Sequence, residues 1–407
     1  MILIIIKRRN VIIRSDRNIM FVIGYLDTIK NWVDPISKYL KNRGYVIHIL
    51  HMQSLNFGVA TDGIKVDPDY LLYDAGEMNL KSIERTMKSI NPVATIFPSF
   101  KSLFEVLLLK ISQTLSIKTI YYQHGLYEDI SFDFKIANKK SSITRYLVLL
   151  SLVLQFVLYI SKQKMRDLLL LFTTVAFAKY DTITFDHFIL YSKYSHDMLM
   201  RRFSNIEDRV LYSGYPIVAS DEELRKFLER SEQPTENYVL YLHQTFVRLN
   251  LTRIDYPREN AYLLNLSHIC RAQNYKLVIR LHPRETIENY KLISEDDNII
   301  MKQSDDLLEN IISSKLVIGH YSTALFSSIL LYKPILILYY PELKVESSVF
   351  KNFGVHANDA NQFRKFIEDE NSWRVDEEQY KLFIDYYIGT NNSYENLANN
   401  IASLCEI

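Results

Sequence analysis

Short apolar runs, each about as long as one buried strand, recur through the second half of this chain. They fall at residues 238–242, 275–281, 316–319 and 335–339, and the last of them completes the predicted sheet. A short apolar run bounded by polar or turn residues is typical of a strand covered on both faces, as in parallel α/β sheets. The chain is therefore predicted to be an α/β protein built on parallel sheets.

Two polar motifs follow these runs directly. His282 and Pro283 come after one predicted strand, and Ser322 and Thr323 come after another and precede a helical pattern. A serine or threonine at a helix start accepts a hydrogen bond from a first-turn amide. The remaining amides and the positive end of the helix dipole attract anions. Because ligands of open α/β sheets bind along the carboxyl edge, the two motifs together predict a nucleotide-phosphate site.

Length and composition narrow the classes of function. The 407 residues suffice for two α/β domains. The 48 basic and 47 acidic residues are nearly balanced, so nucleic acid is not a predicted partner. Only 10 glycines occur, and no glycine-rich phosphate loop is present. Cys270 and Cys405 are far apart and match no metal or redox spacing, so no metal site is predicted.

Alternating strand and helix patterns divide the chain into two halves. The first half begins with a strand–helix–strand unit over residues 18–50 and is predicted to end its sheet at residues 188–191. We expect a Rossmann-like domain at 1–212 and a linker at 213–236. A second Rossmann-like domain at 237–385 and a C-terminal helix at 386–407 are expected to follow.

An apolar helical insertion is predicted at about residues 143–180. Its two apolar runs, 146–160 and 168–178, are separated by Lys162, Lys164 and Arg166. Each run is shorter than the roughly 20 residues that a spanning helix needs. The insertion therefore fits either contact with a membrane surface through its basic residues or a buried helical hairpin.

The motifs resemble those of a known class of enzymes. Arg280, His282 and Pro283, followed by Ser322 and Thr323, are similar to motifs in the C-terminal half of GT-B glycosyltransferases acting on bacterial surface polysaccharides. In bacterial sialyltransferases and polysialyltransferases, a His-Pro motif and a paired-hydroxyl motif hold the cytidine monophosphate leaving group. Teichoic-acid polymerases carry an Arg-x-His-Pro motif and also a His-Gly motif, which the first half of this chain matches after Gln123.

This resemblance implies two Rossmann-like domains facing across a cleft, the first for the acceptor and the second for a nucleotide-sugar donor. UDP-sugar enzymes of this fold usually place a glutamate about four residues after the paired hydroxyls, where this chain has Phe326, Ser327 and Ser328. The implied donor is therefore CMP-sialic acid or a related CMP-activated acidic sugar. The implied acceptor is a glycan or glycolipid of capsule or lipopolysaccharide synthesis.

Two alternatives stay open. One is a CDP-glycerol or polyol phosphotransferase of the teichoic-acid type, and the other is a non-catalytic GT-B-like binding module. The enzyme is expected to invert configuration and to need neither a metal nor another cofactor. It is expected in the cytoplasm, with peripheral contact to the inner face of the cytoplasmic membrane as an open possibility.

Candidate site residues come from the loops that end the predicted strands. His124 is the candidate general base, because an imidazole with a pKa near ~6.5 can accept a proton at neutral pH. Glu128, beside Asp129, is the rival base, and His282 is the candidate donor to the leaving phosphate. The candidate donor-binding residues are His243, Gln244, Thr245, Arg280, Pro283, Tyr321, Ser322 and Thr323.

Overall fold

The computed structural model describes residues 17–55, 66–99, 103–125, 184–201, 206–231, 236–248, 254–283, 285–303, 306–320, 322–339 and 349–406. The predicted insertion at about 143–180 and the candidate residues Glu128 and Tyr321 lie outside these ranges.

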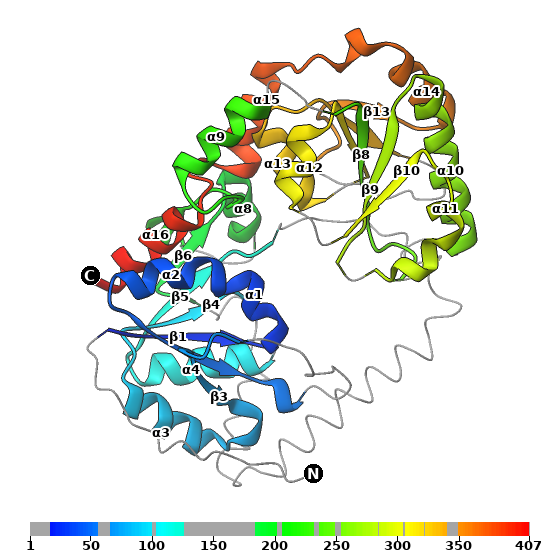
Figure 1. Cartoon of the computed structure of the whole chain (residues 1–407). Coiled ribbons are helices and arrows are strands. Elements are labelled where there is room, and N and C mark those ends of the chain that lie inside the picture. The colour runs from blue at the N-terminus through cyan, green and yellow to red at the C-terminus, as the bar shows by residue number, and fades with distance from the viewer. Residues whose placement is uncertain are drawn as a thin grey trace, which may run out of the picture.

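Within the described residues, the first half forms a seven-stranded parallel sheet in the order β3-β2-β1-β4-β5-β6-β7. Its strands are β1 Asn18–Ile23, β2 Val46–His51, β3 Leu71–Asp74, β4 Ala94–Phe97, β5 Lys118–Tyr122, β6 His187–Leu190 and β7 Val210–Tyr212. Every residue of β1 is buried, as expected for a central strand with helices on both faces. We call this half the N-terminal lobe (Figure 1).

The helices described in the N-terminal lobe are α1 Ile29–Trp32, α2 Asp34–Asn42, α3 Leu80–Ile90, α4 Leu103–Thr114 and α8 Lys193–Met200. Helix α3 shows why they form where they do. The Asn79 side chain accepts a hydrogen bond from the Ser82 amide at its start, and Asn91 ends it in the left-handed conformation. Its buried residues Leu80, Ile83 and Met87 follow the helical repeat and face the sheet.

In the described part of the second half, six parallel strands form a sheet in the order β10-β9-β8-β11-β12-β13. Its strands are β8 Tyr238–Leu242, β9 Lys276–Arg280, β10 Ile299–Lys302, β11 Leu316–Gly319, β12 Ile335–Leu338 and β13 Val355–Ala357. Its helices are α10 Tyr256–Ala272, α11 Lys291–Ser294, α12 Leu307–Ser313, α13 Thr323–Leu330, α14 Ala360–Glu368 and α15 Glu377–Phe383. We call this half the C-terminal lobe.

Within the residues that the structure describes, the chain crosses between the lobes twice. The first crossing leaves β7 and leads to α9 Asp221–Ser231, which packs against α12 of the C-terminal lobe. The second follows a π-helical segment, Ile384–Ile388, and leads to α16 Tyr394–Glu406. Figure 1 shows α16, in red, beside α2 of the N-terminal lobe, in blue. The end of the chain therefore returns to the lobe in which the chain began.

The predicted α/β class with two parallel sheets is confirmed, but the predicted last strand of each sheet is wrong. The three-residue strand β7 extends the first sheet beyond residues 188–191, and β13 extends the second beyond β12. Both are short edge strands with exposed residues, among them Tyr212 at 45% and Val355 at 43%. Such segments lack the continuous apolar run that marked the central strands.

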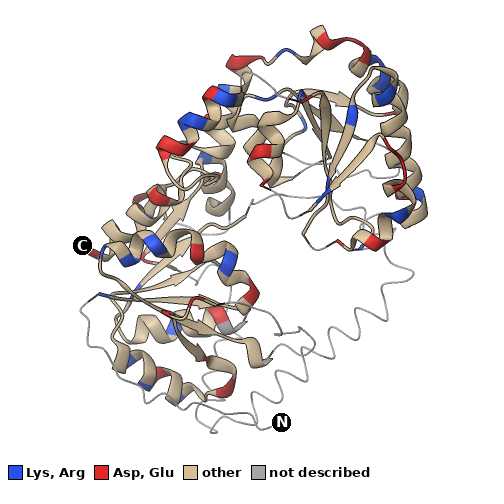
Figure 2. Cartoon of the chain, in the orientation of Figure 1, with Lys and Arg blue, Asp and Glu red and all other residues tan. Residues whose placement is uncertain are grey.

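Figure 2 shows acidic and basic residues interspersed along the outer helices of both lobes. This mixture agrees with the nearly balanced charge of the whole chain. In the part of the chain that the structure describes, no helix is long and apolar enough to cross a membrane.

Candidate functional site

Strands β9, β8 and β11 lie side by side, so their following loops meet at one carboxyl edge. Leu242 of β8 is in register with Arg280 of β9 and with Gly319 of β11. With a strand spacing of about 5 Å, the loops after β9 and β11 lie about 10 Å apart across β8. The His282 and Ser322 motifs are therefore close enough for one nucleotide ligand to contact both.

The loop that carries His282 and Pro283 is held by backbone hydrogen bonds. The His282 carbonyl accepts bonds from the Glu285 amide (2.9 Å) and from Nε2 of Gln303 (3.2 Å). Gln303 also donates to the Glu285 carbonyl (2.8 Å), which closes the loop from the neighbouring strand. His282 and Arg280 are half-buried and Pro283 is exposed, so the motif lies at the rim of the sheet edge.

The paired hydroxyls begin α13 as predicted. Ser322 has an extended backbone, and its hydroxyl oxygen accepts a hydrogen bond from the Ala324 amide (3.1 Å). A hydroxyl that accepts such a bond still has its proton to donate. Thr323 is the first residue of the helix. Both hydroxyl residues are half-buried at the positive end of the helix dipole.

His243 lies inside the C-terminal lobe. Its Nε2 is 3.2 Å from Oε1 of Glu259 in α10 and 3.0 Å from the hydroxyl of Tyr290, which donates to Glu259 Oε2 (2.9 Å). Because a carboxylate only accepts hydrogen bonds, the nitrogen facing Glu259 carries a hydrogen. The His243 side chain has no exposed surface. Of its neighbours in the same loop, Gln244 is half-buried and Thr245 is buried.

His320 is a second buried histidine at this edge. It follows β11, and its Nδ1 donates to the Leu338 carbonyl (2.8 Å). Burial is the main cause that lowers the pKa of His320 to about 3, and the nearby His243 adds to it. The ring is therefore neutral at physiological pH, with its Nε2 3.5 Å from the Tyr262 hydroxyl.

The candidate base lies at the carboxyl edge of the other sheet. Gln123, directly after β5, is buried; its side-chain oxygen accepts from the Tyr191 amide (2.9 Å), and its nitrogen donates to the Gly125 carbonyl (2.7 Å). These bonds fix the loop on both sides of His124. The half-buried imidazole of His124 lies 4.1 Å, centroid to centroid, from the indole of Trp32.

Sequence reasoning missed several residues that contact the candidates. They are Trp32, Glu259 and Tyr290, and the buried His320 lies next to the paired-hydroxyl motif in the chain. His320 stands beside Tyr321 and Ser322 in the sequence, so its position next to the motif was visible. The other contacts join segments that are far apart in the chain, and no local pattern marks them.

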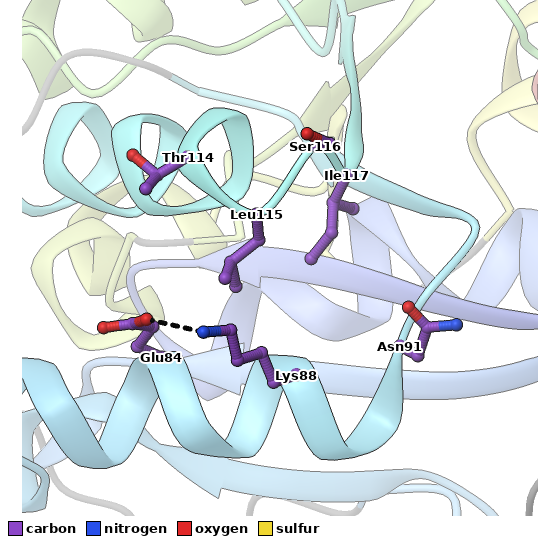
Figure 3. Close-up of a pocket in the computed structure, with 7 residues that line it drawn as sticks. All are labelled: Glu84, Lys88, Asn91, Thr114, Leu115, Ser116 and Ile117. Carbon is purple, nitrogen blue, oxygen red and sulfur yellow. Dashed lines mark hydrogen bonds and ion pairs between the residues drawn. The ribbon is translucent and has the colours of Figure 1, made fainter.

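A hollow of about 240 Å³ lies at the opposite edge of the N-terminal sheet (Figure 3). It is lined by Glu84, Lys88, Asn91, Thr114, Leu115, Ser116 and Ile117. Asn91 and Ile117 precede β4 and β5, whereas His124 follows β5. The hollow therefore lies at the opposite end of the strands from the candidate site.

Two parallel sheets with the candidate residues on their carboxyl edges define the GT-B class, and solved structures agree. The fold is similar to the UDP-GlcNAc 2-epimerase of Methanocaldococcus jannaschii, with TM-score 0.54, 13% identity and coverage of 95% of this chain and 99% of that one. It is similar to a glycosyltransferase of Rickettsia africae ESF-5 (TM-score 0.53, 12% identity, 96% and 98% coverage). It is also similar to the wall teichoic acid polymerase TagF (TM-score 0.56, 15% identity, 96% and 89% coverage).

Residues 6–340 match the family model of the alpha-2,8-polysialyltransferases. The chain belongs to this family and is a glycosyltransferase, which uses a nucleotide-sugar donor and a glycan acceptor. A search among curated proteins found no match to the sequence.

Proposed function

We propose that this glycosyltransferase transfers an acidic sugar of the sialic-acid type from a CMP-activated donor to a glycan acceptor in capsule or lipopolysaccharide synthesis. The observation that carries the proposal is the placement of His282 and the Ser322–Thr323 pair on the two strands that flank β8, at one sheet edge. Membership of the polysialyltransferase family supports the same donor class.

The donor site needs groups that stabilise a departing phosphate. His282 can donate a hydrogen bond to a phosphate oxygen, and so can the Ser322 hydroxyl, whose oxygen already caps the helix. The positive end of α13 adds to the attraction. We propose that these groups stabilise the negative charge of the leaving phosphate without a metal.

The residues after the paired hydroxyls support a CMP donor over a UDP donor. Phe326, Ser327 and Ser328 are all buried in α13, and none carries a carboxylate. The ribose contact expected of a UDP-sugar enzyme of this fold therefore has no counterpart at these positions.

The acceptor half of the reaction is assigned to the N-terminal lobe. His124 takes the proton from an acceptor hydroxyl, and that oxygen attacks the anomeric carbon of the donor sugar. The bond from this carbon to the phosphate oxygen breaks, and CMP leaves with the electron pair. Attack from the side opposite the leaving group inverts the configuration.

Matched variants, one in each lobe, test donor binding and general-base catalysis separately. Thermal shift is measured with CMP, CDP, UDP and GDP, and transfer is measured from a CMP-sialic acid donor. CMP should raise the melting temperature most, because a ligand that binds only the folded state stabilises it. His282→Ala should lose this shift and the transfer activity. His124→Ala should keep the shift and lose transfer by the ~10²–10⁴-fold typical of a missing general base.

Other outcomes would change the assigned base, the assigned donor or the assigned function. If Glu128→Gln abolishes transfer and His124→Ala only weakens it, the carboxylate is the base. A shift with CDP alone, together with transfer from CDP-glycerol, would make the protein a polyol phosphotransferase. Glycan binding without a shift from any nucleotide would leave a non-catalytic module. Unchanged turnover in a folded His282→Ala protein would refute the phosphate contact.

A further inference from the structure

The loops after β1, β2 and β3 are joined by hydrogen bonds at the carboxyl edge of the N-terminal sheet. The Leu26 amide, beyond β1, donates to Oε1 of Gln53, beyond β2 (3.0 Å). The amide and the hydroxyl of Ser54 donate to the carboxylate of Asp74 at the end of β3 (3.1 and 2.9 Å). These bonds hold the three loops together, so the other polar groups on them are also held in place.

Gln53 carries a hydrogen-bond donor that lacks a partner. Its side-chain oxygen accepts from the Leu26 amide, and this bond fixes which end of the side-chain amide is Nε2. The residue is only 7% exposed, and Nε2 has no hydrogen-bond partner among the residues that the structure describes. An unpaired buried donor costs about 1–3 kcal/mol. A ligand oxygen that accepts this hydrogen bond would remove the cost.

His51 and Asp74 are in register at the ends of neighbouring strands and add a donor and an acceptor. Nδ1 of His51 accepts from the Gln53 amide (3.3 Å), so the proton of the neutral ring is on Nε2, which can donate. Burial is the main cause that lowers the pKa of His51 and keeps the ring neutral. The half-buried Asp74 accepts from Ser54 and from the Gly76 amide, and a carboxylate has about four acceptor positions. It can therefore also accept from a ligand hydroxyl.

Tyr25 adds an aromatic ring to the same edge. It follows β1, directly before Leu26, and is 45% exposed. Its carbonyl accepts from the hydroxyl and the amide of Thr28 (2.6 and 3.2 Å), which holds its backbone in place. The face of a tyrosine ring packs well against apolar C–H surface, which one face of a pyranose sugar offers. An exposed aromatic ring beside fixed donors and acceptors suits a sugar ligand.

Helix α1 connects this edge to the candidate base. It ends at Trp32, whose carbonyl accepts from the Tyr122 hydroxyl (2.5 Å) and whose indole contacts His124. In the strand order β2-β1-β4-β5, β1 lies about 10 Å and β2 about 15 Å from β5, at a spacing of about 5 Å per strand. An acceptor that reacts at His124 therefore reaches these loops only with sugar residues behind the reacting one.

The charges on these loops favour an uncharged sugar. Asp27, Asp74 and Glu77 carry carboxylates, which repel an anionic sugar. The cation Lys30 lies on α1, between these loops and Trp32 in the chain. Sugar hydroxyls and N-acetyl carbonyls, by contrast, can pair with both the donors and the acceptor described above.

We propose that the carboxyl edge after β1, β2 and β3 binds an uncharged sugar of the acceptor glycan, behind the residue that reacts at His124. The residues that form this sugar site are Tyr25, His51, Gln53 and Asp74. This inference rests on the proposed function, because it takes His124 as the place where the acceptor reacts.

Binding of oligosaccharides to the full-length protein without a donor tests the sugar site. The probes are lacto-N-neotetraose and maltotetraose, which are uncharged, and a sialic acid trimer, which is anionic. Titration followed by NMR should detect binding of at least one uncharged probe. Tyr25→Ala and Gln53→Glu should each weaken that binding about 3- to 10-fold, as expected for the loss of one contact.

The variants are chosen to leave the fold and the donor site intact. Gln53→Glu keeps the oxygen that accepts from the Leu26 amide and replaces only the Nε2 donor. The matched control is Tyr212→Ala, because Tyr212 is also 45% exposed but ends β7, on the other side of β5. It should bind the probe like the wild type. The thermal shift with CMP should be unchanged in all three variants, because the proposed donor site is in the other lobe.

The sugar site and the proposed function can fail separately. Absence of binding by both uncharged probes, or wild-type binding by Tyr25→Ala and Gln53→Glu, would refute the sugar site and leave the donor site standing. Tighter binding of the sialic acid trimer than of both uncharged probes would refute the assignment to an uncharged sugar. If no nucleotide shifts the melting temperature while an uncharged probe binds through Tyr25 and Gln53, the proposed function fails and the sugar site stands.

Discussion

Hydrogen bonds among individual buried polar residues hold the loop after β8 in place beside the candidate site. Glu259 accepts hydrogen bonds from Tyr290 and His243 in a region with no solvent access. Burial is the main cause that raises the pKa of Tyr290 well above its ordinary value, so it remains a donor to Glu259. An unpaired buried polar group costs about 1–3 kcal/mol, so these hydrogen bonds stabilise the buried Glu259 and Tyr290 side chains. This cluster fixes the loop after β8 beside the two predicted motifs.

His320 makes a pH-dependent contribution to stability that can be measured. Burial lowers the pKa of His320 to about 3 in the folded protein, whereas in the unfolded chain the pKa is near the ordinary histidine value of 6.5. Between these values the unfolded state binds more protons, so stability falls as pH drops below about 6.5. The loss at pH 5 should be about 2 kcal/mol from this residue.

The variant His320→Asn keeps a donor near the Leu338 carbonyl and removes the titrating ring. Urea unfolding at pH 7 and pH 5 should therefore show a smaller acid-induced loss in the variant, by about 2 kcal/mol. An acid-induced loss equal to that of the wild type would show that His320 does not carry this effect.

At the level of secondary-structure elements, the two crossings between the lobes depend on backbone geometry that only glycine accommodates. A Cβ on Gly389 would overlap the Tyr191 carbonyl, and a Cβ on Gly214 would overlap the Thr390 carbonyl. Both residues also have the positive φ that other residues adopt at a cost. These two close approaches explain why glycine stands at both positions in a chain with only 10 glycines.

Gly389→Ala should destabilise the protein by at least about 1–3 kcal/mol, the cost of a strained backbone with an added clash. The matched control is Gly24→Ala, because a Cβ at Gly24 would meet no atom within 4 Å. Thermal unfolding compares the two variants. Equal melting temperatures for Gly389→Ala and Gly24→Ala would contradict the close backbone approach at Gly389.

At the scale of the whole molecule, the C-terminal helix belongs to the core of the N-terminal lobe. Leu397, Ile401 and Leu404 of α16 are buried in one cluster with Ile19 and Phe21 of β1. The two lobes are therefore joined by a chain that leaves the N-terminal lobe, builds the C-terminal lobe and returns. Any change in the angle between the lobes must act on both crossings.

Ile401→Ala should therefore destabilise the N-terminal lobe, although the residue lies near the end of the chain. Removing a fully buried isoleucine side chain costs about 2–5 kcal/mol. Hydrogen exchange should show faster exchange for amides of β1 and β2, with β8 and β9 unaffected. Leu382→Ala, at a side chain 64% exposed, is the control and should change little. Faster exchange confined to the C-terminal lobe would contradict this placement.

Much of the fold could be predicted from local patterns. The apolar runs of β8, β9, β11 and β12 identified central strands because such strands are buried on both faces. The same patterns put His124, His282 and Ser322 just after strands and so at carboxyl edges. Short edge strands such as β13 carry too few buried residues to give this pattern.

The sequence by itself determined the class of fold, the strand-end positions of the motifs and the helix start at Ser322, because these depend on neighbouring residues. Only the tertiary structure decided which side chains meet. It turned His243 toward Glu259 inside the lobe, placed the ring of Tyr215 against Phe326 of α13, and returned α16 to the N-terminal lobe. An apolar pattern reports that a face is buried but not which distant segment covers it, so these contacts required the folded chain.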